Sequence, residues 1–241
     1  MKLITKITIP KYNSKISHSE KCLFIGSCFA ENIGEKLLEN KFNVSVNPLG
    51  ISYNPISLIN SLSYAIENRK IEESELFFSN GQWNHYNFHS NFSDSDKYTC
   101  LNKINSSIER TNNFISSADY IFISLGTSFI YELAENQKIV TNCHKQPDSF
   151  FKRRMLNTEE ITKSFDLFFQ KMSKINPRAK YIFTVSPVRH KRYGFVANQF
   201  SKSLLIVALN NLLRKNENLS YFPSFEIMMD ELRDYRFYNE D

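Results

Sequence analysis

The stretch that decides the fold is Cys22-Leu23-Phe24-Ile25-Gly26-Ser27-Cys28-Phe29-Ala30. Its first four residues are apolar and predict a short strand, and the three that follow predict a tight turn. After the turn, Ala30, Ile33 and Leu37 recur at the spacing of one helix face. A strand, a turn and an amphipathic helix in immediate succession are the building unit of an α/β protein.

The same unit recurs along the chain. Further strands are predicted over residues 44–46, 120–125, 181–185 and 219–222, and helices over 55–66, 158–176 and about 197–215. The runs 120–125 and 181–185 are almost entirely apolar, which is typical of central parallel strands covered on both faces. The pattern predicts one α/β domain over residues 1–241, a parallel sheet with helices on both sides. Residues 68–95 and 127–157 fit neither period and are interpreted as insertions or lids.

Composition narrows the possible partners. The chain has 241 residues and a formal net charge of +5, but its Lys and Arg residues are scattered, so we expect no nucleic-acid partner. No apolar run approaches the ~20 residues that span a bilayer, so no membrane segment is predicted. The four cysteines lack a disulfide or CxxC spacing, and the N-terminus has no apolar secretion signal. These features favour a cytoplasmic protein with reduced thiols.

Small, polar or nucleophilic residues follow four of the predicted strands. They are Gly26-Ser27-Cys28, Gly50, Gly126-Thr127-Ser128 and Ser186-Pro187-Val188-Arg189-His190. In an open parallel sheet, ligands bind outside the carboxyl ends of the strands. We therefore expect these residues to share one rim and to form a site there.

The first of these turns carries the most chemistry. A Cys at the start of a helix lies beside free backbone N–H groups and the positive end of the helix dipole. That environment favours a thiolate and can hold an oxyanion. Gly26 would allow the close backbone approach that such a turn needs. The alternative interpretation is a small buried Cys in a tight strand-to-helix turn, with no catalytic role.

Residues 24–32, Phe24-Ile25-Gly26-Ser27-Cys28-Phe29-Ala30-Glu31-Asn32, resemble the signature of the bacterial GSCFA family. The resemblance extends over residues 20–241 and includes Asn47-Pro48-Leu49-Gly50, Tyr53-Asn54-Pro55, Trp83 with His89-Ser90, Asn142-Cys143-His144-Lys145, Ser186-Pro187-Val188-Arg189-His190, Asn198-Gln199 with Ser201-Lys202, Tyr221-Phe222-Pro223-Ser224 and residues 230–238. That family is placed with the SGNH (GDSL-like) hydrolases. The resemblance therefore implies a flavodoxin-like, three-layer α/β/α fold and acyl-ester chemistry.

The resemblance also implies roles for individual residues. Cys28 takes the position of the nucleophile, and a one-residue slip would give that role to Ser27. Gly50 matches the glycine whose N–H is the second oxyanion donor. Ser128, in the block that begins at Gly126, stands where the superfamily has an Asn as third donor, with Asn142 as a substitute from the following loop.

The superfamily's base is the His of an Asp-x-x-His near the C-terminus. This chain ends at Asn239-Glu240-Asp241, so Asp241 would be the Asp of that motif and the chain would lack its C-terminal segment. His190 and then His144 are the substitute candidates. We expect His89 to line the pocket and Arg189 to contact an anion.

The predicted function is hydrolysis of an acyl or acetyl ester, of a small molecule or a glycan. The alternatives are an O-acyltransferase that uses the same site and a catalytically silent ligand-binding module. No cofactor is expected. No metal site is expected either, because His85 and His89 lack a third ligand at a suitable spacing.

Overall fold

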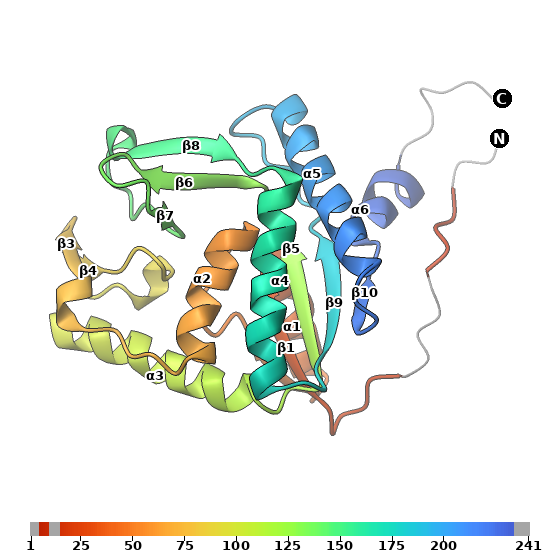
Figure 1. The fold of residues 1–241 in the computed structure, drawn as a ribbon, viewed down its shortest axis with the longest axis horizontal. Coiled ribbons are helices and arrows are strands. Elements are labelled where there is room, and N and C mark those ends of the chain that lie inside the picture. Colours follow the sequence, from red (N-terminus) through yellow and green to blue (C-terminus); the bar gives the residue numbers. More distant parts are fainter. Residues whose placement is uncertain (1–4, 10–14, 234–241) are drawn as a thin grey trace.

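The computed structural model describes residues 5–9 and 15–233 (Figure 1). Its centre is a sheet of five strands: β1 (Lys21–Gly26), β2 (Asn43–Val46), β5 (Tyr120–Leu125), β9 (Lys180–Val185) and β10 (Leu219–Tyr221). The spatial order is β10-β9-β5-β1-β2, and every neighbouring pair is parallel. Counted along the chain, that order is 2-1-3-4-5, the flavodoxin-like arrangement. The predicted fold class and the five predicted strands are confirmed.

The helices are α1 (Cys28–Glu39), α2 (Pro55–Ile66), α3 (Lys97–Ile115), α4 (Thr158–Ile175), α5 (Phe195–Leu213) and the short α6 (Ser224–Glu226). As Pro55 indicates, α2 starts there, and the Asn54 side chain accepts a hydrogen bond from the Ser57 N–H as its cap. The helix α3 was not predicted. Its buried face carries apolar residues at helical spacing, Cys100, Ile104 and Ile108, together with the polar Ser107 and Thr111.

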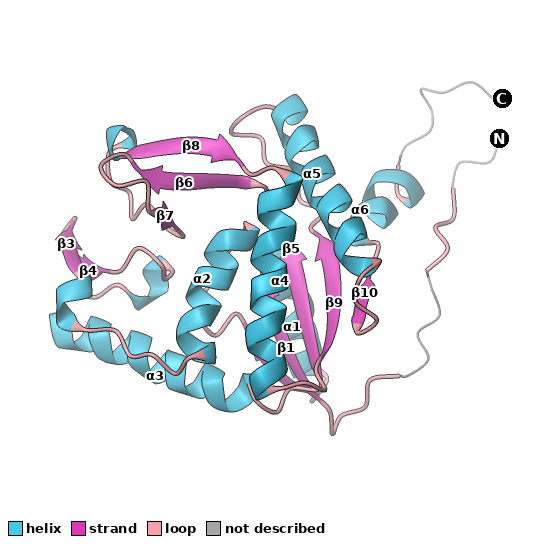
Figure 2. Cartoon of the chain, viewed as in Figure 1, coloured by secondary structure: helices cyan, strands magenta, loops and turns pink. Residues whose placement is uncertain are grey.

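The main core lies on one face of the sheet. Leu23, Ile25 and Ile123 point to this face, and they belong to one buried cluster with Leu62 of α2 and Phe165 of α4. Figure 2 shows α2, α4 and α5 side by side in front of the strands. Because consecutive residues of a strand point to opposite faces, Phe24 belongs to a second, smaller cluster behind the sheet.

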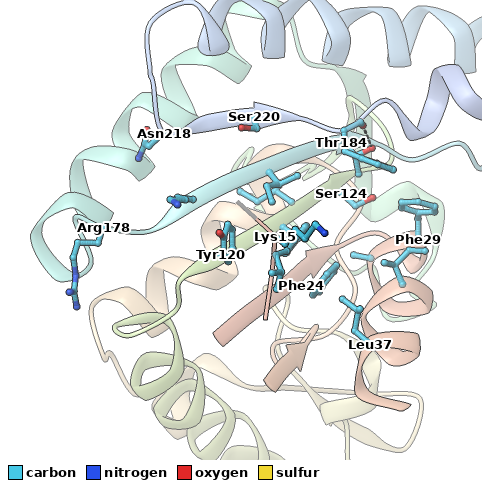
Figure 3. A pocket seen from close by; sticks show the side chains of 18 of the residues that line it. Lys15, Phe24, Phe29, Leu37, Tyr120, Ser124, Arg178, Thr184, Asn218 and Ser220 are labelled. Atoms are coloured by element: carbon cyan, nitrogen blue, oxygen red, sulfur yellow. Dashed lines mark hydrogen bonds between the residues drawn. The ribbon is translucent and has the colours of Figure 1, made fainter. Parts of the chain in front are cut away.

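The second face carries α1, which packs against β1 and β2. Beside α1, an apolar cavity of about 820 Å³ runs along the strands. Figure 3 shows Phe29 and Leu37 of α1 beside Phe24 of β1 at this cavity. The predicted apolar stripe of α1 therefore faces the sheet, but Ile33 and Leu37 remain partly exposed where the cavity opens.

The segments interpreted as insertions contain small antiparallel sheets. Residues 68–95 include the hairpin of β3 (Phe77–Ser79) and β4 (Gln82–Asn84), which turns at Asn80-Gly81. Residues 127–157 contain β6 (Phe129–Leu133), β7 (Ile139–Val140) and β8 (Phe151–Met155). Short 3₁₀ turns lie at Glu73–Glu75, Ser90–Phe92 and Asp148–Phe150, and a π-helical turn at Ile227–Glu231. Within the described part of the chain, no helix combines the length and the apolar character that a membrane span requires.

Candidate active site

The turn after β1 depends on glycine. Gly26 has a φ of +119°, and a Cβ added there would lie 2.1 Å from the carbonyl oxygen of Ser124 on β5. Both the backbone angle and the close approach exclude other residues. The two strands therefore meet at the start of the turn, which fixes the direction in which Ser27 and Cys28 leave the sheet.

Ser27 is the cap of α1. It is 1% exposed, its Oγ lies 2.7 Å from the Oγ of Ser124, and it accepts a hydrogen bond from the Phe29 N–H. The Ser27 hydroxyl thus has two hydrogen-bond partners inside the fold. The burial and the contacts of Ser27 favour Cys28 over Ser27 as the nucleophile.

Cys28 is the first residue of α1 and is half-buried. It thus lies where the first N–H groups of the helix have no partner within the helix. Burial raises the pKa of Cys22 to about 11 and, with the carboxylate of Asp148, that of Cys143 also to about 11. Both of those thiols are protonated at neutral pH. Its place at the start of α1 therefore distinguishes Cys28 from Cys22 and Cys143 as the candidate nucleophile.

The turn after β2 lies beside the turn after β1, and the residue that offers a free donor there is Asn47. The N–H of Gly50 donates to the carbonyl of Asn47 at 2.8 Å, so it is already engaged in the local turn. The Oδ1 atom of Asn47 accepts the Gly26 N–H at 2.9 Å, while its Nδ2 is buried with no hydrogen-bond partner among the described residues. Asn47 is thus a free donor next to the nucleophile turn, whereas the prediction was Gly50. His89 packs against Gly50, and its Nδ1 accepts the Asn91 N–H.

The turn after β5 is hydrogen-bonded to α5 through Ser128 and Ser201. Ser128 is fully buried, and both its N–H and its hydroxyl donate to the Oγ of Ser201, at 2.7 and 3.1 Å. The N–H of Gly126 donates to the Tyr53 carbonyl at 2.8 Å. The contacts of Ser128 therefore do not support its predicted role as third oxyanion donor.

His144 and Asn142 lie in a different part of the molecule. The Nε2 of His144 is 3.0 Å from the carbonyl oxygen of His85, and its ring packs edge-on against Phe77 of β3. Asn142 accepts the His144 N–H. Burial lowers the pKa of His144. The ring is thus engaged in the packing around the β3–β4 hairpin rather than against Cys28.

His190 and Arg189 remain at the rim, on the exposed loop after β9. The His190 ring centroid lies 6.4 Å from that of Tyr53. Burial raises the pKa of Tyr53, and negative charge on Cys28 raises it further. The Arg189 guanidinium lies 5.4 Å from the Phe195 ring, on the solvent side of α5.

Three buried polar residues of α5 were not assigned a role from the sequence. Asn198, Ser201 and Lys202 lie on one face of the helix, at positions i, i+3 and i+4. Lys202 is 0% exposed, and its Nζ donates to the carbonyls of Gly126 and Ser186 at 3.0 and 2.6 Å. Burial lowers its pKa to about 8, Arg189 lowers it as well, and Cys28 opposes the shift. The Asn198-Gln199-x-Ser201-Lys202 motif is the sequence feature that could have pointed to these three residues.

Within residues 5–9 and 15–233, no three His, Cys, Asp or Glu side chains gather as metal ligands. Asp241, the residue assigned to a C-terminal Asp-x-x-His, lies outside the described residues. The carboxyl rim of the sheet thus holds a half-buried thiol at a helix start, an amide donor, a buried lysine and an exposed imidazole.

A family model described as the GSCFA family matches residues 21–241. The chain belongs to the GSCFA family. The resemblance seen in the motifs is therefore confirmed at the level of the family. No curated protein sequence matches this GSCFA chain.

Two solved structures resemble this GSCFA chain distantly. One is an acetyl xylan esterase (Est2A) from the rumen bacterium Butyrivibrio proteoclasticus, 13% identical with a TM-score of 0.39, over 88% of this chain and 57% of that one. The other is a carbohydrate esterase family 2 enzyme with a carbohydrate binding domain from Corynascus thermopiles (Myceliophthora fergusii). It is 17% identical with a TM-score of 0.29, over 44% of this chain and 27% of that one. The chain thus spans less than two thirds of either protein.

Proposed function

We propose that this GSCFA protein is an SGNH-type hydrolase of acyl or acetyl esters, with Cys28 as its nucleophile. One observation carries the proposal. Cys28 opens α1 at the carboxyl rim of a flavodoxin-like sheet, half-buried, while its neighbour Ser27 is buried as the helix cap. A thiol in this position meets the requirements for covalent catalysis, since it can reach a ligand and its anion is favoured by the helix terminus.

The buried Lys202 interacts electrostatically with Cys28. Below pH 8 the buried Lys202 is mostly charged, and its charge interacts favourably with an anionic Cys28. Lys202 is held between two strand ends by its hydrogen bonds to Gly126 and Ser186, so its charge stays fixed at the rim. Lys202 acts here as a positioning residue that stabilises the anion without contacting the substrate.

In the first half of the reaction, the thiol proton of Cys28 passes to His190, which becomes the imidazolium, and the Cys28 sulfur attacks the ester carbonyl carbon to form a C–S bond. The oxyanion is held by the Cys28 N–H at the start of α1 and by the Nδ2 of Asn47. The C–O bond then breaks, and the leaving alcohol takes a proton from the imidazolium of His190. In the second half, water attacks the thioester, its proton passes to His190, and the C–S bond breaks. Reduced Cys28 is required throughout, as expected in a cytoplasmic setting.

Hydrolysis of 4-nitrophenyl acetate tests this mechanism. The intact chain should hydrolyse the ester, Cys28→Ala should lose at least 100-fold in kcat/KM, and Ser27→Ala should keep most of the activity. Mass spectrometry of a rapidly quenched reaction should find the acyl group on the peptide that contains Cys28.

Three other outcomes would contradict specific parts of the proposal. Activity that survives Cys28→Ala and is lost in Ser27→Ala would transfer the nucleophile role to Ser27. Full activity in both variants would rule out the site. No hydrolysis by the intact chain would leave a ligand-binding module as the better interpretation.

A further inference from the structure

A second cavity lies at the same rim, beside Tyr53. Its volume is about 180 Å³, and Tyr53, Thr127, Phe129, Tyr131, His190 and Asn198 are among its lining residues. These residues come from the loops that follow β2, β5 and β9, from β6 and from α5. Loops at the carboxyl ends of three strands of the sheet therefore line the cavity, and this is where an open α/β sheet binds ligands.

Asn198 presents an unpaired donor at this cavity. The residue is 5% exposed, and its Oδ1 accepts the His190 N–H at 2.8 Å. Because only the amide oxygen can accept that hydrogen bond, the opposite end of the amide is the NH₂ group. This Nδ2 is buried and has no hydrogen-bond partner among the described residues. An unsatisfied buried donor costs about 1–3 kcal/mol, and an oxygen of a ligand in the cavity would remove this cost.

The other lining residues include the aromatic Tyr131 and Tyr193 and the charged Arg192, whose Nη2 lies 3.9 Å from the Oδ1 of Asp148. The hydroxyls of Tyr131 and Tyr193 are hydrogen-bonded to each other. The guanidinium of Arg153 lies 3.6 Å from the centroid of the Tyr193 ring and 5.0 Å from that of Phe129. Flat rings with polar edges suit a ligand that has apolar C–H faces and a rim of hydroxyl groups. A pyranose ring has both.

Tyr53 relates this cavity to Cys28. Tyr53 contacts Gly126, because a Cβ at Gly126 would lie 3.2 Å from the Tyr53 Cδ1, and Tyr53 interacts electrostatically with Cys28. Tyr53 thus both lines the cavity and interacts electrostatically with Cys28.

We infer that this cavity binds the pyranose ring of a neutral sugar ester, with the Asn198 amide donating to a ring or hydroxyl oxygen. The inference rests on the proposed function for the ester group, but binding of the sugar itself does not depend on catalysis. It therefore has a test that needs no turnover.

The binding test uses the full chain with Cys28→Ala and titrates it with methyl β-xyloside, followed by NMR chemical-shift changes. Binding should weaken at least tenfold when Asn198→Asp is added. That variant keeps the acceptor for the His190 N–H and replaces the NH₂ donor by an oxygen. Ser203→Ala, on the exposed side of the same helix, is the matched control and should change nothing.

The catalytic test compares two substrates. With Cys28 present, Asn198→Asp should lower kcat/KM for an acetylated methyl xyloside at least tenfold more than it lowers kcat/KM for 4-nitrophenyl acetate. No binding of the xyloside, in a protein that hydrolyses 4-nitrophenyl acetate, would overturn the sugar subsite alone. Xyloside binding without any ester hydrolysis would overturn the proposed function alone. Binding of glucuronate but not of the neutral xyloside would overturn the assignment to a neutral sugar.

Discussion

The Oγ atoms of Ser27 and Ser124 lie 2.7 Å apart, and the two residues are 1% and 2% exposed. This hydrogen bond joins the nucleophile turn to β5, the central strand of the sheet. It is reinforced by the Ser27 N–H, which donates to the Ser124 carbonyl at 2.9 Å. The position of Cys28 is thus set by its buried neighbour.

Ser27→Ala should destabilise the fold while sparing the chemistry. The substitution removes a helix cap and leaves the Ser124 hydroxyl without this partner, which together should cost about 1–3 kcal/mol. Urea denaturation followed by circular dichroism measures the loss. Cys28→Ala is the control and should stay within about 0.5 kcal/mol of the unmodified chain, as is usual for a site away from the core. Equal stability of the two variants would contradict the role given to Ser27.

Alkylation should distinguish the four cysteines. At pH 8, iodoacetamide should modify Cys28 first, because Cys22 and Cys100 are buried and Cys143 has a pKa of about 11. Peptide mapping by mass spectrometry after partial labelling identifies the site. Equal labelling of Cys143 in the folded chain would show that its thiol is more accessible than the structure indicates.

Lys202→Met should change how activity depends on pH. Burial lowers the pKa of Lys202 to about 8, so its positive charge is lost as the pH rises through 8. The kcat/KM profile of the unmodified chain should therefore change near pH 8, and this change should be missing in Lys202→Met. Lys202→Arg stays charged throughout and should keep the rate of the unmodified chain below pH 8. A lower rate with an unchanged profile in both variants would indicate a purely structural role for Lys202.

His85 should make the fold sensitive to mild acid. Burial lowers its pKa from 6.5 to about 4, and its Nδ1 accepts the Asn87 N–H. Between these two values the unfolded chain binds the proton and the folded chain does not. Above pH 6.5, His85 is neutral in both states and does not change the free energy of unfolding. As the pH falls toward 4, the free energy of unfolding decreases by about 3 kcal/mol.

His85→Gln should flatten this part of the stability curve. Urea unfolding at several values between pH 4 and 7 measures the slope for each variant. His18→Gln, the same substitution at an exposed histidine, is the control for the change of residue type. An identical slope in the unmodified chain and in His85→Gln would show that His85 does not cause the acid sensitivity.

The sequence predicts the sheet well because its strands are continuous apolar runs. The helix α3 was missed although Cys100, Ile104 and Ile108 recur at helical spacing, because the polar Ser107 and Thr111 share its buried face. The rim was predicted from strand ends, and Tyr53, which was not part of that prediction, has its ring centroid 6.4 Å from that of His190. The sequence cannot show which hydrogen bonds a turn makes, so it could not show that the N–H of Gly50 and the hydroxyl of Ser128 are already engaged.

Lys202 was missed for a related reason. Lysine is almost always exposed, and its position in a motif does not show that two strand-end carbonyls replace water around its ammonium group. Asn47 and Asn198 could not be singled out from the sequence either. In each, the amide oxygen has a hydrogen-bond partner and the amide nitrogen has none among the described residues, and this depends on how the chain folds around the side chain.

The polar face of α5 has a consequence for how this site can change during evolution. Asn198, Ser201 and Lys202 each hold a different part of the two loops that follow β5 and β9. Insertions in either loop must preserve these anchor points, whereas the solvent side of the same helix is unconstrained. We expect specificity among relatives to diverge through the side chains that line the cavity, while the spacing Asn-x-x-Ser-Lys stays fixed.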